Sequence, residues 1–518
     1  MEDKVLLAVG ASLLFVFLTK LISHATSTAP RRRLHLPPGP WTLPLIGSVH
    51  HIVSSSESVH SVMRKLASRH GPLMQLWFGE VPTVVVSSPE AAQEILRSHD
   101  LAFADRHMTS TTAVVTFGGA DVVMAPYGER WRHLRKLLTQ ELLTVSRVRS
   151  FRRVREEEVS RLVRDLSAAA AAADSSDAGV NLTEMVARMT NDTVLRCSVG
   201  SRCKYSGEYL AALRAVVRLS SGITVADLFP SSRLASMVGT APRRALANRK
   251  KMEWIIEQII QERKDQMETD TGDQAAAAES KPCSLHVLLR LQKEGGTPIP
   301  ITNEVIVVLF IDMFAAGTDT SSTTLIWTMA ELIRSPRVMA KVQAEIRQAF
   351  QGKNTITEDD LGQLSYLKMV IKESLRLHCP VPLLSPRKCR ETTKVMGYDI
   401  PKGTSVFVNV WAICRDSKYW EDAEDFKPER FEKRDIEYKG SNFEFLPFGS
   451  GRRICPGINL GLANMEFALA NLLYYFDWKL PNGMLYKDLD MREAPGLVAG
   501  KLTSLNVCPV THIAPSCS

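Results

Sequence analysis

The sequence has few features that would divide it into separate units. Its 518 residues contain no internal repeat and no proline-, glycine- or serine-rich tract long enough to separate domains. One large domain is therefore expected. Hydrophobic residues make up 45% of the chain and charged residues 23%, so the chain can bury a sizeable core and bulk disorder is not expected.

Paired cysteines and a strong excess of charge are also missing. The nine cysteines are scattered and include no C-x-x-C pair, which argues against a zinc or dithiol site and fits a reducing compartment. The formal net charge of +8 is small for this length, and no stripe combines basic with aromatic residues. Nucleic-acid binding is therefore not expected, whereas a basic face for an acidic protein partner is compatible with the charge.

An apolar segment opens the chain. Residues 5–22 are mostly apolar and carry no charge apart from Lys20, and a helix of this length just spans a thin bilayer. We expect residues 1–29 to form a transmembrane anchor. A cleaved signal peptide is the alternative, but no small-residue cleavage site directly follows the apolar run. The arginines at 31–33 then place the following domain on the cytoplasmic side.

The residues after this segment predict a hinge and then one mainly helical domain. Pro37-Pro38-Gly39-Pro40 excludes helix and favours an extended chain, so residues 30–44 are expected to form a basic, proline-rich hinge. Over residues 45–518, apolar residues recur mostly at helical spacing. Two β-like runs, 83–86 and 405–410, are bounded by proline or glycine and predict a minor sheet. The expected fold class is α+β, mainly α-helical.

Four shorter segments carry more specific predictions. Apolar residues at helical spacing predict helix within 331–350 and within 459–476. The low-complexity stretches 168–177 and 269–281 are expected to be solvated loops between helices. Neither stretch is expected to carry chemistry.

One loop near the C-terminus carries the strongest chemical indication. The segment Phe448-Gly-Ser-Gly-Arg-Arg-Ile-Cys455-Pro-Gly457 leads directly into an apolar helical run. Glycines such as Gly449 and Gly457 let the backbone approach a metal closely, and amide groups can soften the charge of a thiolate. Phe448 can shield the sulfur, and Arg453 can meet a cofactor carboxylate. The alternative is a glycine-rich turn around a buried structural cysteine, which the complete ten-residue string argues against.

With this loop, the sequence resembles the cytochrome P450 superfamily, whose ligand loop reads F-x-x-G-x-R-x-C-x-G. Every fixed position is matched. The Pro-Pro-Gly-Pro segment and the phrase Ala-Ala-Gly-Thr-Asp-Thr at 315–320 resemble the plant A-type branch of the endoplasmic reticulum. The sequence is also similar to grass oxidases of terpenoid defence metabolism. The resemblance implies that heme b is the cofactor and that Cys455 is the axial thiolate ligand of its iron.

A long apolar segment with an acid and an alcohol at its centre is the second chemical feature. Residues 302–331 predict one helix with the first residue as its N-cap, on which Asp312, Ala316 and the Asp319–Thr320 pair share one stripe. Small residues leave room for a diatomic ligand, and the resemblance implies that Asp319 and Thr320 assist cleavage of the O–O bond. The alternative is that Thr320 bonds to a carbonyl of its own helix while Asp319 forms an outward salt bridge.

The resemblance also assigns residues that the sequence alone would leave as ordinary positions. Glu373 and Arg376 are spaced to pair on one helix face, and with Arg430 they are implied to form a buried structural network behind the haem. The implied partners of the haem propionates are Trp131, Arg135, Arg387 and Arg453. The implied substrate pocket is mainly apolar and includes Val308, Asp312, Ala316, Val381, Leu384 and Leu497. Cys379 stands where relatives usually carry proline, so the loop at the pocket is expected to differ in shape.

These features together predict an NADPH- and O2-dependent monooxygenase that oxidises a small hydrophobic molecule. A terpenoid (diterpene or sesquiterpene) is favoured, and phenolic or indolic substrates stay open. The resemblance implies a membrane-anchored enzyme of the endoplasmic reticulum, single-pass, with its catalytic domain in the cytoplasm. An NADPH-dependent cytochrome P450 reductase would deliver the electrons. The basic patch expected to meet the reductase consists of Arg132, His133, Lys136 and Arg452.

Two other functions are disfavoured by what the sequence contains. A haem-thiolate isomerase that rearranges hydroperoxides needs neither dioxygen nor a reductase, but its relatives usually lack the acid and alcohol found at Asp319 and Thr320. A haem-thiolate sensor would more often be joined to a signalling domain, and none is visible. Substrate-dependent consumption of NADPH would distinguish the monooxygenase from both.

Overall fold

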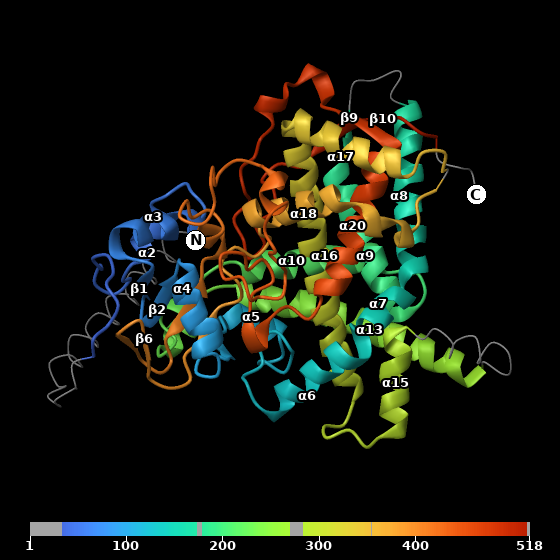
Figure 1. The fold of residues 1–518 in the computed structure, drawn as a ribbon. Helices are drawn as coiled ribbons and strands as arrows, with labels where there is room; N and C mark the ends of the chain where they lie inside the picture. Colours follow the sequence, from blue (N-terminus) through green and yellow to red (C-terminus); the bar gives the residue numbers. More distant parts are fainter. Residues whose placement is uncertain (1–33, 173–178, 270–282, 354, 515–518) are drawn as a thin grey trace, which may run out of the picture.

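The fold is mainly helical, with β1, β2 and β6 at one side and β9 and β10 at the opposite, upper side (Figure 1). The computed structural model describes residues 34–172, 179–269, 283–353 and 355–514. The longer helices are α3 (Val59–His70), α6 (Glu129–Leu137), α8 (Arg152–Ala172), α9 (Leu182–Val199), α10 (Ser206–Ser220), α13 (Ala241–Thr269), α15 (Ser284–Glu294), α16 (Asn303–Arg334), α17 (Pro336–Ala349), α18 (Ser365–Leu377) and α20 (Ile458–Tyr475).

Short helices and single turns connect these elements. The short α-helices are α2 (Val49–Val53), α4 (Pro89–Gln93), α5 (Ser110–Val115), α7 (Val145–Ser150), α11 (Val225–Leu228), α12 (Arg233–Met237) and α19 (Val410–Ile413). The turns of 3-10 or π type are η1 (Glu94–Ser98), η2 (Leu138–Leu142), η4 (Glu358–Gln363), η5 (Pro428–Phe431), η6 (Gly451–Arg453), η7 (Pro481–Gly483) and η8 (Tyr486–Asp488).

The largest sheet has the strand order β1-β2-β8-β5-β3. Its strands are β1 (Leu73–Phe78), β2 (Val81–Val86), β8 (Ser405–Val408), β5 (Arg387–Lys388) and β3 (Asp105–Arg106). β2 and β8 are parallel, with Thr83 opposite Ser405, and the other neighbours are antiparallel. The smaller sheets join β4 (Val180–Asn181), β10 (Asn506–Thr511) and β9 (Phe476–Lys479), and β6 (Thr393–Val395) with β7 (Tyr398–Ile400). The α+β, mainly helical prediction is confirmed.

Helix α16 runs through the middle of the helical part and packs against α9, α13, α18 and α20. It contributes to two hydrophobic clusters, one containing Phe314 and the other Trp327, and both side chains are fully buried. Thr302 caps it as predicted, since its side chain accepts the Val305 N–H at 3.3 Å. Among the described residues, α16 is the one helix long and apolar enough to cross a membrane, but most of it is buried, as in the core helix of a globular domain. The predicted anchor at 1–29 lies outside the described residues.

Two expectations about loops and helix limits are wrong in part. Residues 168–172 are not a loop but complete α8, because alanine has the highest intrinsic helix propensity. The rest of that stretch, and all but the first residue of 269–281, lie outside the described residues. The helical spacing over 331–350 spans two helices, because Pro336 cannot extend α16 and begins α17 at the first helical position.

The proline-rich segment before the domain is docked onto it. It has no regular structure, as its prolines predict. The Asp399 N–H donates to the His35 carbonyl at 2.6 Å, and the Gln75 N–H donates to the Pro38 carbonyl at 2.8 Å. Gly39 is required beside these bonds, because a Cβ atom there would lie 2.0 Å from the Gln75 carbonyl oxygen. This part of the expected hinge therefore belongs to the folded domain.

Candidate active site

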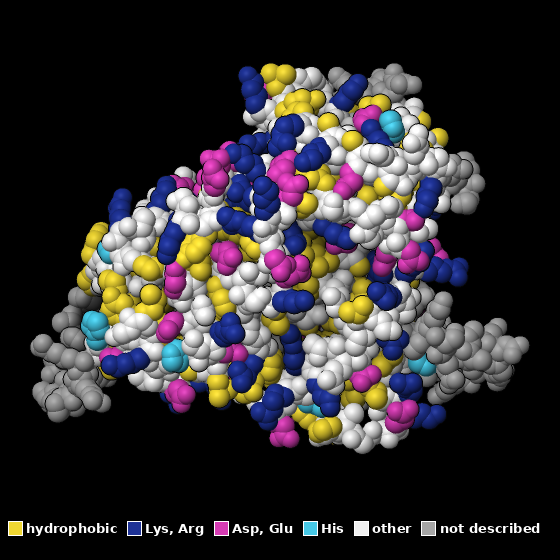
Figure 2. Space-filling model, viewed as in Figure 1, with side chains coloured by type: hydrophobic (Ala, Val, Ile, Leu, Met, Phe, Trp, Pro, Cys, Tyr) yellow, Lys and Arg dark blue, Asp and Glu magenta, His cyan; other side chains and the backbone are white. Residues whose placement is uncertain are grey.

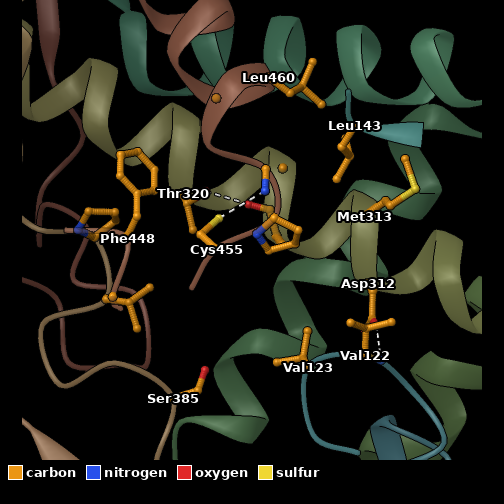
Figure 3. Close-up of a pocket in the computed structure, with 18 of the residues that line it drawn as sticks. Val122, Val123, Leu143, Asp312, Met313, Thr320, Ser385, Phe448, Cys455 and Leu460 are labelled. Carbon is orange, nitrogen blue, oxygen red and sulfur yellow. Dashed lines mark hydrogen bonds between the residues drawn. The ribbon is translucent and has the colours of Figure 1, made fainter. Parts of the chain in front are cut away.

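Cys455 lies in the turn between η6 and α20, in the wall of a cavity that α16 also lines (Figure 3). The Gly457 N–H donates to its Sγ at 3.3 Å, and the Cys455 N–H donates to the Phe448 carbonyl at 3.0 Å. Gly451 has a φ of +71°, and a Cβ atom there would lie 2.2 Å from the Leu96 carbonyl oxygen. Only glycine therefore allows the loop to fold tightly enough to present the sulfur to the cavity.

The surroundings of the sulfur suit a buried metal ligand. Burial raises the pKa of Cys455, whereas the Gly457 N–H and the charge of Arg135 lower it. Arg135 also donates to the Ile454 carbonyl, which holds the guanidinium beside the loop. A thiol that ligates a metal loses its proton, so the amide and the guanidinium would stabilise the charge retained on the sulfur.

Four arginines line the same cavity: Arg106, Arg135, Arg387 and Arg453. Burial and repulsion among these cations lower the pKa of Arg106 and lower that of Arg453 to about 10. Arg387 has an acidic partner, Asp100, at 2.9 Å, whereas Arg453 donates only to backbone carbonyls. The cavity thus holds more buried positive charge than its own acids neutralise, which fits a cofactor that carries carboxylate groups.

Trp131 and Arg106 both line this cationic cavity, and only Trp131 was predicted to do so. The Trp131 Nε1–H already donates to the Val122 carbonyl at 3.0 Å, and its ring lies 4.3 Å from the Arg453 guanidinium. Trp131 therefore packs against Arg453, another residue predicted to meet a propionate. Arg106 was missed by sequence reasoning although it faces the cavity and donates to the Val123 carbonyl at 3.1 Å. No local motif marks Arg106, because its place depends on the pairing of β3 with β5.

Thr320 and Asp319 lie in the middle of α16, and both face the cavity or its extension. The Thr320 hydroxyl donates to the Ala316 carbonyl at 2.6 Å, so this part of the alternative interpretation describes the structure. The other part does not: the described residues form no ion pair with Asp319, and the nearby Arg214 pairs with Glu184 at 2.9 Å. Burial raises the pKa of Asp319. An acid of this kind beside an alcohol can move protons into the cavity.

An apolar extension continues from the Cys455 cavity along α16. Ala316 and Val381 line both parts, Leu384 lines the part nearer Cys455, and Val308 and Leu497 line the extension. The structure therefore brings these predicted pocket residues together, although they come from distant parts of the chain. An apolar cavity with few polar groups suits a small hydrophobic molecule.

Glu373, Arg376 and Arg430 form one ion-pair network. Arg376 donates to both carboxylate oxygens of Glu373, at 2.8 and 2.9 Å, and Arg430 donates to the same carboxylate at 2.9 Å. Glu373 and Arg376 are fully buried. Arg376 also donates to the Cys414 carbonyl at 2.7 Å. None of the three charged residues lines the described cavity, so their role is to hold the loops behind it.

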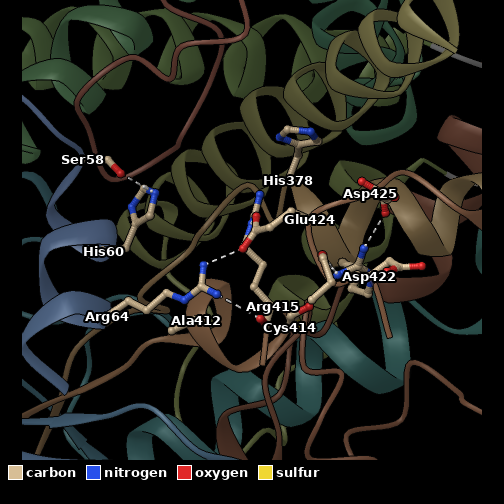
Figure 4. Close-up of polar contacts among 12 residues, drawn as sticks. Ser58, His60, Arg64, His378, Ala412, Cys414, Arg415, Asp422, Glu424 and Asp425 are labelled. Atoms are coloured by element: carbon tan, nitrogen blue, oxygen red, sulfur yellow. Dashed lines mark hydrogen bonds and ion pairs between the residues drawn. The ribbon is translucent and has the colours of Figure 1, made fainter. Parts of the chain in front are cut away.

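A second polar cluster adjoins this network (Figure 4). Arg415 donates to Glu424 at 3.1 Å, and His60 from α3 contacts Glu493 at 2.6 Å. Glu493 begins the segment that brings Leu497 to the cavity. No sequence pattern indicates the contact between His60 and Glu493, because these residues lie 433 positions apart.

Cys379 is buried and packs against the cysteine loop. Its Sγ lies 3.7 Å from the Pro447 carbonyl oxygen. Its neighbours Pro380 and Val381 line the described cavity, whereas Cys379 does not. Cys379 therefore packs behind the cavity wall.

The basic patch expected to meet the reductase is only partly available to a protein partner. Arg132, Lys136 and Arg452 are exposed, but Arg452 also pairs with Asp100 at 3.0 Å. The pKa of His133 is lowered by burial and by Lys136. Several basic side chains lie low on the face drawn in Figure 2, where α6 lies in Figure 1.

Comparisons with known proteins agree with this geometry. The family model described as Cytochrome P450 matches residues 37–504. The chain is 65% identical to an ent-cassadiene hydroxylase of Oryza sativa subsp. japonica over 518 residues, covering 100% of this chain and 99% of that protein. It is 59% identical to a zealexin A1 synthase of Zea mays over 517 residues, 99% of each chain. A solved zebra fish cytochrome P450 with progesterone has a TM-score of 0.72 at 24% identity, covering 87% of this chain and 99% of that chain, and supports the fold.

Proposed function

The chain belongs to the cytochrome P450 family and is a haem-thiolate monooxygenase; we propose that it hydroxylates a small terpenoid, a diterpene or a sesquiterpene. The observation that best supports this proposal is a cavity lined by both Cys455 and Thr320, with an apolar extension beyond them. Relatives named for ent-cassadiene, ent-isokaurene and dolabradiene support the substrate class. The apolar lining is compatible with such molecules and offers few polar groups to a phenol.

We further propose that the haem is heme b and that this chain supplies its ligand and its setting. Haem iron with a thiolate ligand supplies the activation of dioxygen when it is bound. Cys455 would ligate the iron, and Arg135, Arg387 and Arg453 would hold the propionates. Phe448, Gly449 and Gly457 shape the loop that keeps water from the sulfur.

Residues of the cavity would orient the substrate and supply protons. Val381, Leu384 and the other apolar residues would orient the substrate and exclude water. Asp319, whose pKa is raised, would hold a proton near the centre of α16. Thr320 would hold a water that passes this proton on.

Redox partner and location complete the proposal. Family members use a redox partner, and we propose an NADPH-dependent cytochrome P450 reductase that docks at Arg132, Lys136 and Arg452. His133 lies in the same helix but is partly buried. We also propose that residues 1–29 anchor the protein in the endoplasmic reticulum membrane, with residues 45–518 as the cytoplasmic catalytic domain.

A reconstituted assay tests the proposal. Full-length protein in vesicles with the reductase should convert ent-cassadiene or ent-isokaurene to hydroxylated products only with NADPH and dioxygen. Cys455→His should abolish both turnover and the red-shifted carbon-monoxide Soret band, because imidazole cannot replace the thiolate. Cys203→Ser, a change at a cysteine outside the cavity, should keep both. Product formation without NADPH would instead indicate an isomerase.

A further inference from the structure

Two carboxylates lie side by side in the cavity wall. Asp312 comes from α16 and Asp121 from the loop that precedes α6, and the two side chains interact directly. Asp312 Oδ2 accepts the Val122 N–H at 2.8 Å, and Asp121 Oδ1 accepts the Met124 N–H at 2.9 Å. Asp121 is almost completely buried, and its Oδ2 accepts no hydrogen bond from any described N–H or hydroxyl group. Two buried carboxyl groups in this arrangement need a shared proton.

The loop segment held by Asp312 lines the cavity at the point where it meets its apolar extension. While the Val122 N–H binds Asp312, the Val122 carbonyl accepts from Trp131 at 3.0 Å and from Arg453 at 3.3 Å. Val123 lines both the Cys455 cavity and its extension (Figure 3). A shift of this segment would therefore change the space between the substrate and the reactive centre.

We propose that Asp312, paired with Asp121, is a positioning residue that holds the Val122–Val123 segment against the cavity and thereby sets which carbon of the substrate is oxidised. The inference rests on the proposed function, because it concerns the orientation of a substrate in that same cavity. It extends the sequence expectation, which placed Asp312 among apolar pocket residues without a task of its own. The acid acts through the loop and need not touch the substrate.

The charges around the pair predict how it responds to pH. Burial raises the pKa of Asp121 to about 6, and burial together with the neighbouring Asp121 raises that of Asp312. Arg106 and Arg453 face Asp121, and the Tyr209 phenol faces Asp312. Because both pKa values are raised, the pair is stable when protonated and loses stability as the pH rises through these values. Above them, two like charges repel and the segment is held less firmly.

Product ratios from ent-cassadiene and ent-isokaurene test the inference. Asp312→Ala removes the acceptor of the Val122 N–H and should change the ratio of hydroxylated isomers about fivefold or more, the factor expected for one hydrogen bond of ordinary strength. Asp312→Asn keeps an acceptor and adds a donor toward Asp121, so it should restore the wild-type ratio. As the pH rises through about 6 and above, that ratio should drift in the wild type and stay constant in Asp312→Asn. The matched control is Glu304→Gln, an exposed acid in the first turn of the same helix.

A second measurement does not depend on substrate. Hydrogen exchange of the amides at 121–125 should accelerate in Asp312→Ala and stay slow in Asp312→Asn, with the carbon-monoxide spectrum showing that each protein holds haem. An unchanged product ratio in a haem-replete Asp312→Ala protein, or the same pH drift in Asp312→Asn as in the wild type, would overturn the inference. A wild type that forms no NADPH-dependent product would count against the proposed function, while the exchange data would still decide whether Asp312 holds the segment.

Discussion

At position 320, one hydrogen bond limits what the side chain can do. The hydroxyl proton is donated to the Ala316 carbonyl at 2.6 Å, so toward the cavity Thr320 offers an oxygen that accepts. Asp319, next to it, is the group whose raised pKa lets it keep a proton. In the proposed reaction the two residues would thus have different tasks: Asp319 would hold the proton, and Thr320 would hold the water that carries it.

Thr320→Ala should uncouple the reaction without disabling the protein. Haem uptake, substrate binding and NADPH oxidation should persist, because none of these steps needs a hydroxyl at this place. Product per NADPH should fall markedly, since a positioned proton donor is worth about 100-fold or more, and hydrogen peroxide should rise in its place. Thr320→Ser, which keeps the hydroxyl, serves as the control. Equal coupling in the alanine variant would show that the bond to Ala316 is the residue's whole role.

At the scale of elements, α18 and η5 are joined by a buried charge network. Glu373 accepts from Arg376 within α18 and from Arg430 of η5, and its Oε1 also accepts the Lys427 N–H at 2.8 Å. This carboxylate is the common acceptor for two largely buried cations. Its removal would leave those cations without a counter-charge.

Glu373→Gln should lower the free energy of unfolding by about 3–5 kcal/mol, the cost of leaving buried charges unpaired. The loss should appear in denaturant unfolding and as a lower haem content after expression. The matched control is Asp422→Asn, because Asp422 forms an exposed ion pair with Lys427 in the same region. A surface pair of that kind contributes about 1 kcal/mol or less. Equal losses in both variants would mean that burial does not set the strength of the Glu373 network.

At the scale of the whole molecule, the folded domain begins earlier than a hinge over 30–44 would suggest. His35 and Pro38 are bonded to β7 and β1, and the family match begins at residue 37. The extended segment is therefore a part of the domain surface, and we expect only the residues before it to be expendable for folding.

Deletion of residues 1–29 should weaken membrane binding and leave the carbon-monoxide spectrum and the unfolding midpoint unchanged. Deletion of residues 1–44 removes the carbonyls of His35 and Pro38 as acceptors and the segment that covers Gln75. It should lower the unfolding midpoint by about 1–2 °C, as expected for a loss of about 1–2 kcal/mol in a domain of this size. Vesicle flotation measures the first effect and thermal unfolding the second. Full membrane binding by the shorter deletion would locate the anchor elsewhere on the surface.

The sequence by itself determined the features that depend on local order along the chain. The ligand loop around Cys455 is contiguous, so its glycines and the cysteine could be interpreted together. The spacing of apolar residues and the N-cap residue likewise predict the helix around Thr320, and the structure contains this helix and its cap. The strand-like runs at 83–86 and 405–410 could be predicted because strand-forming residues and the proline or glycine residues that bound them are local features of the sequence.

Only the tertiary structure decided which residues, distant in the sequence, line the same cavity. Arg106 joins the cationic cavity because β3 pairs with β5, and Asp121 meets Asp312 because a loop folds back on α16. The Trp131 Nε1–H donates to the Val122 carbonyl, a contact that residue spacing does not predict. Such contacts join groups far apart in the sequence, and the burial that shifts their pKa values exists only once the chain has folded.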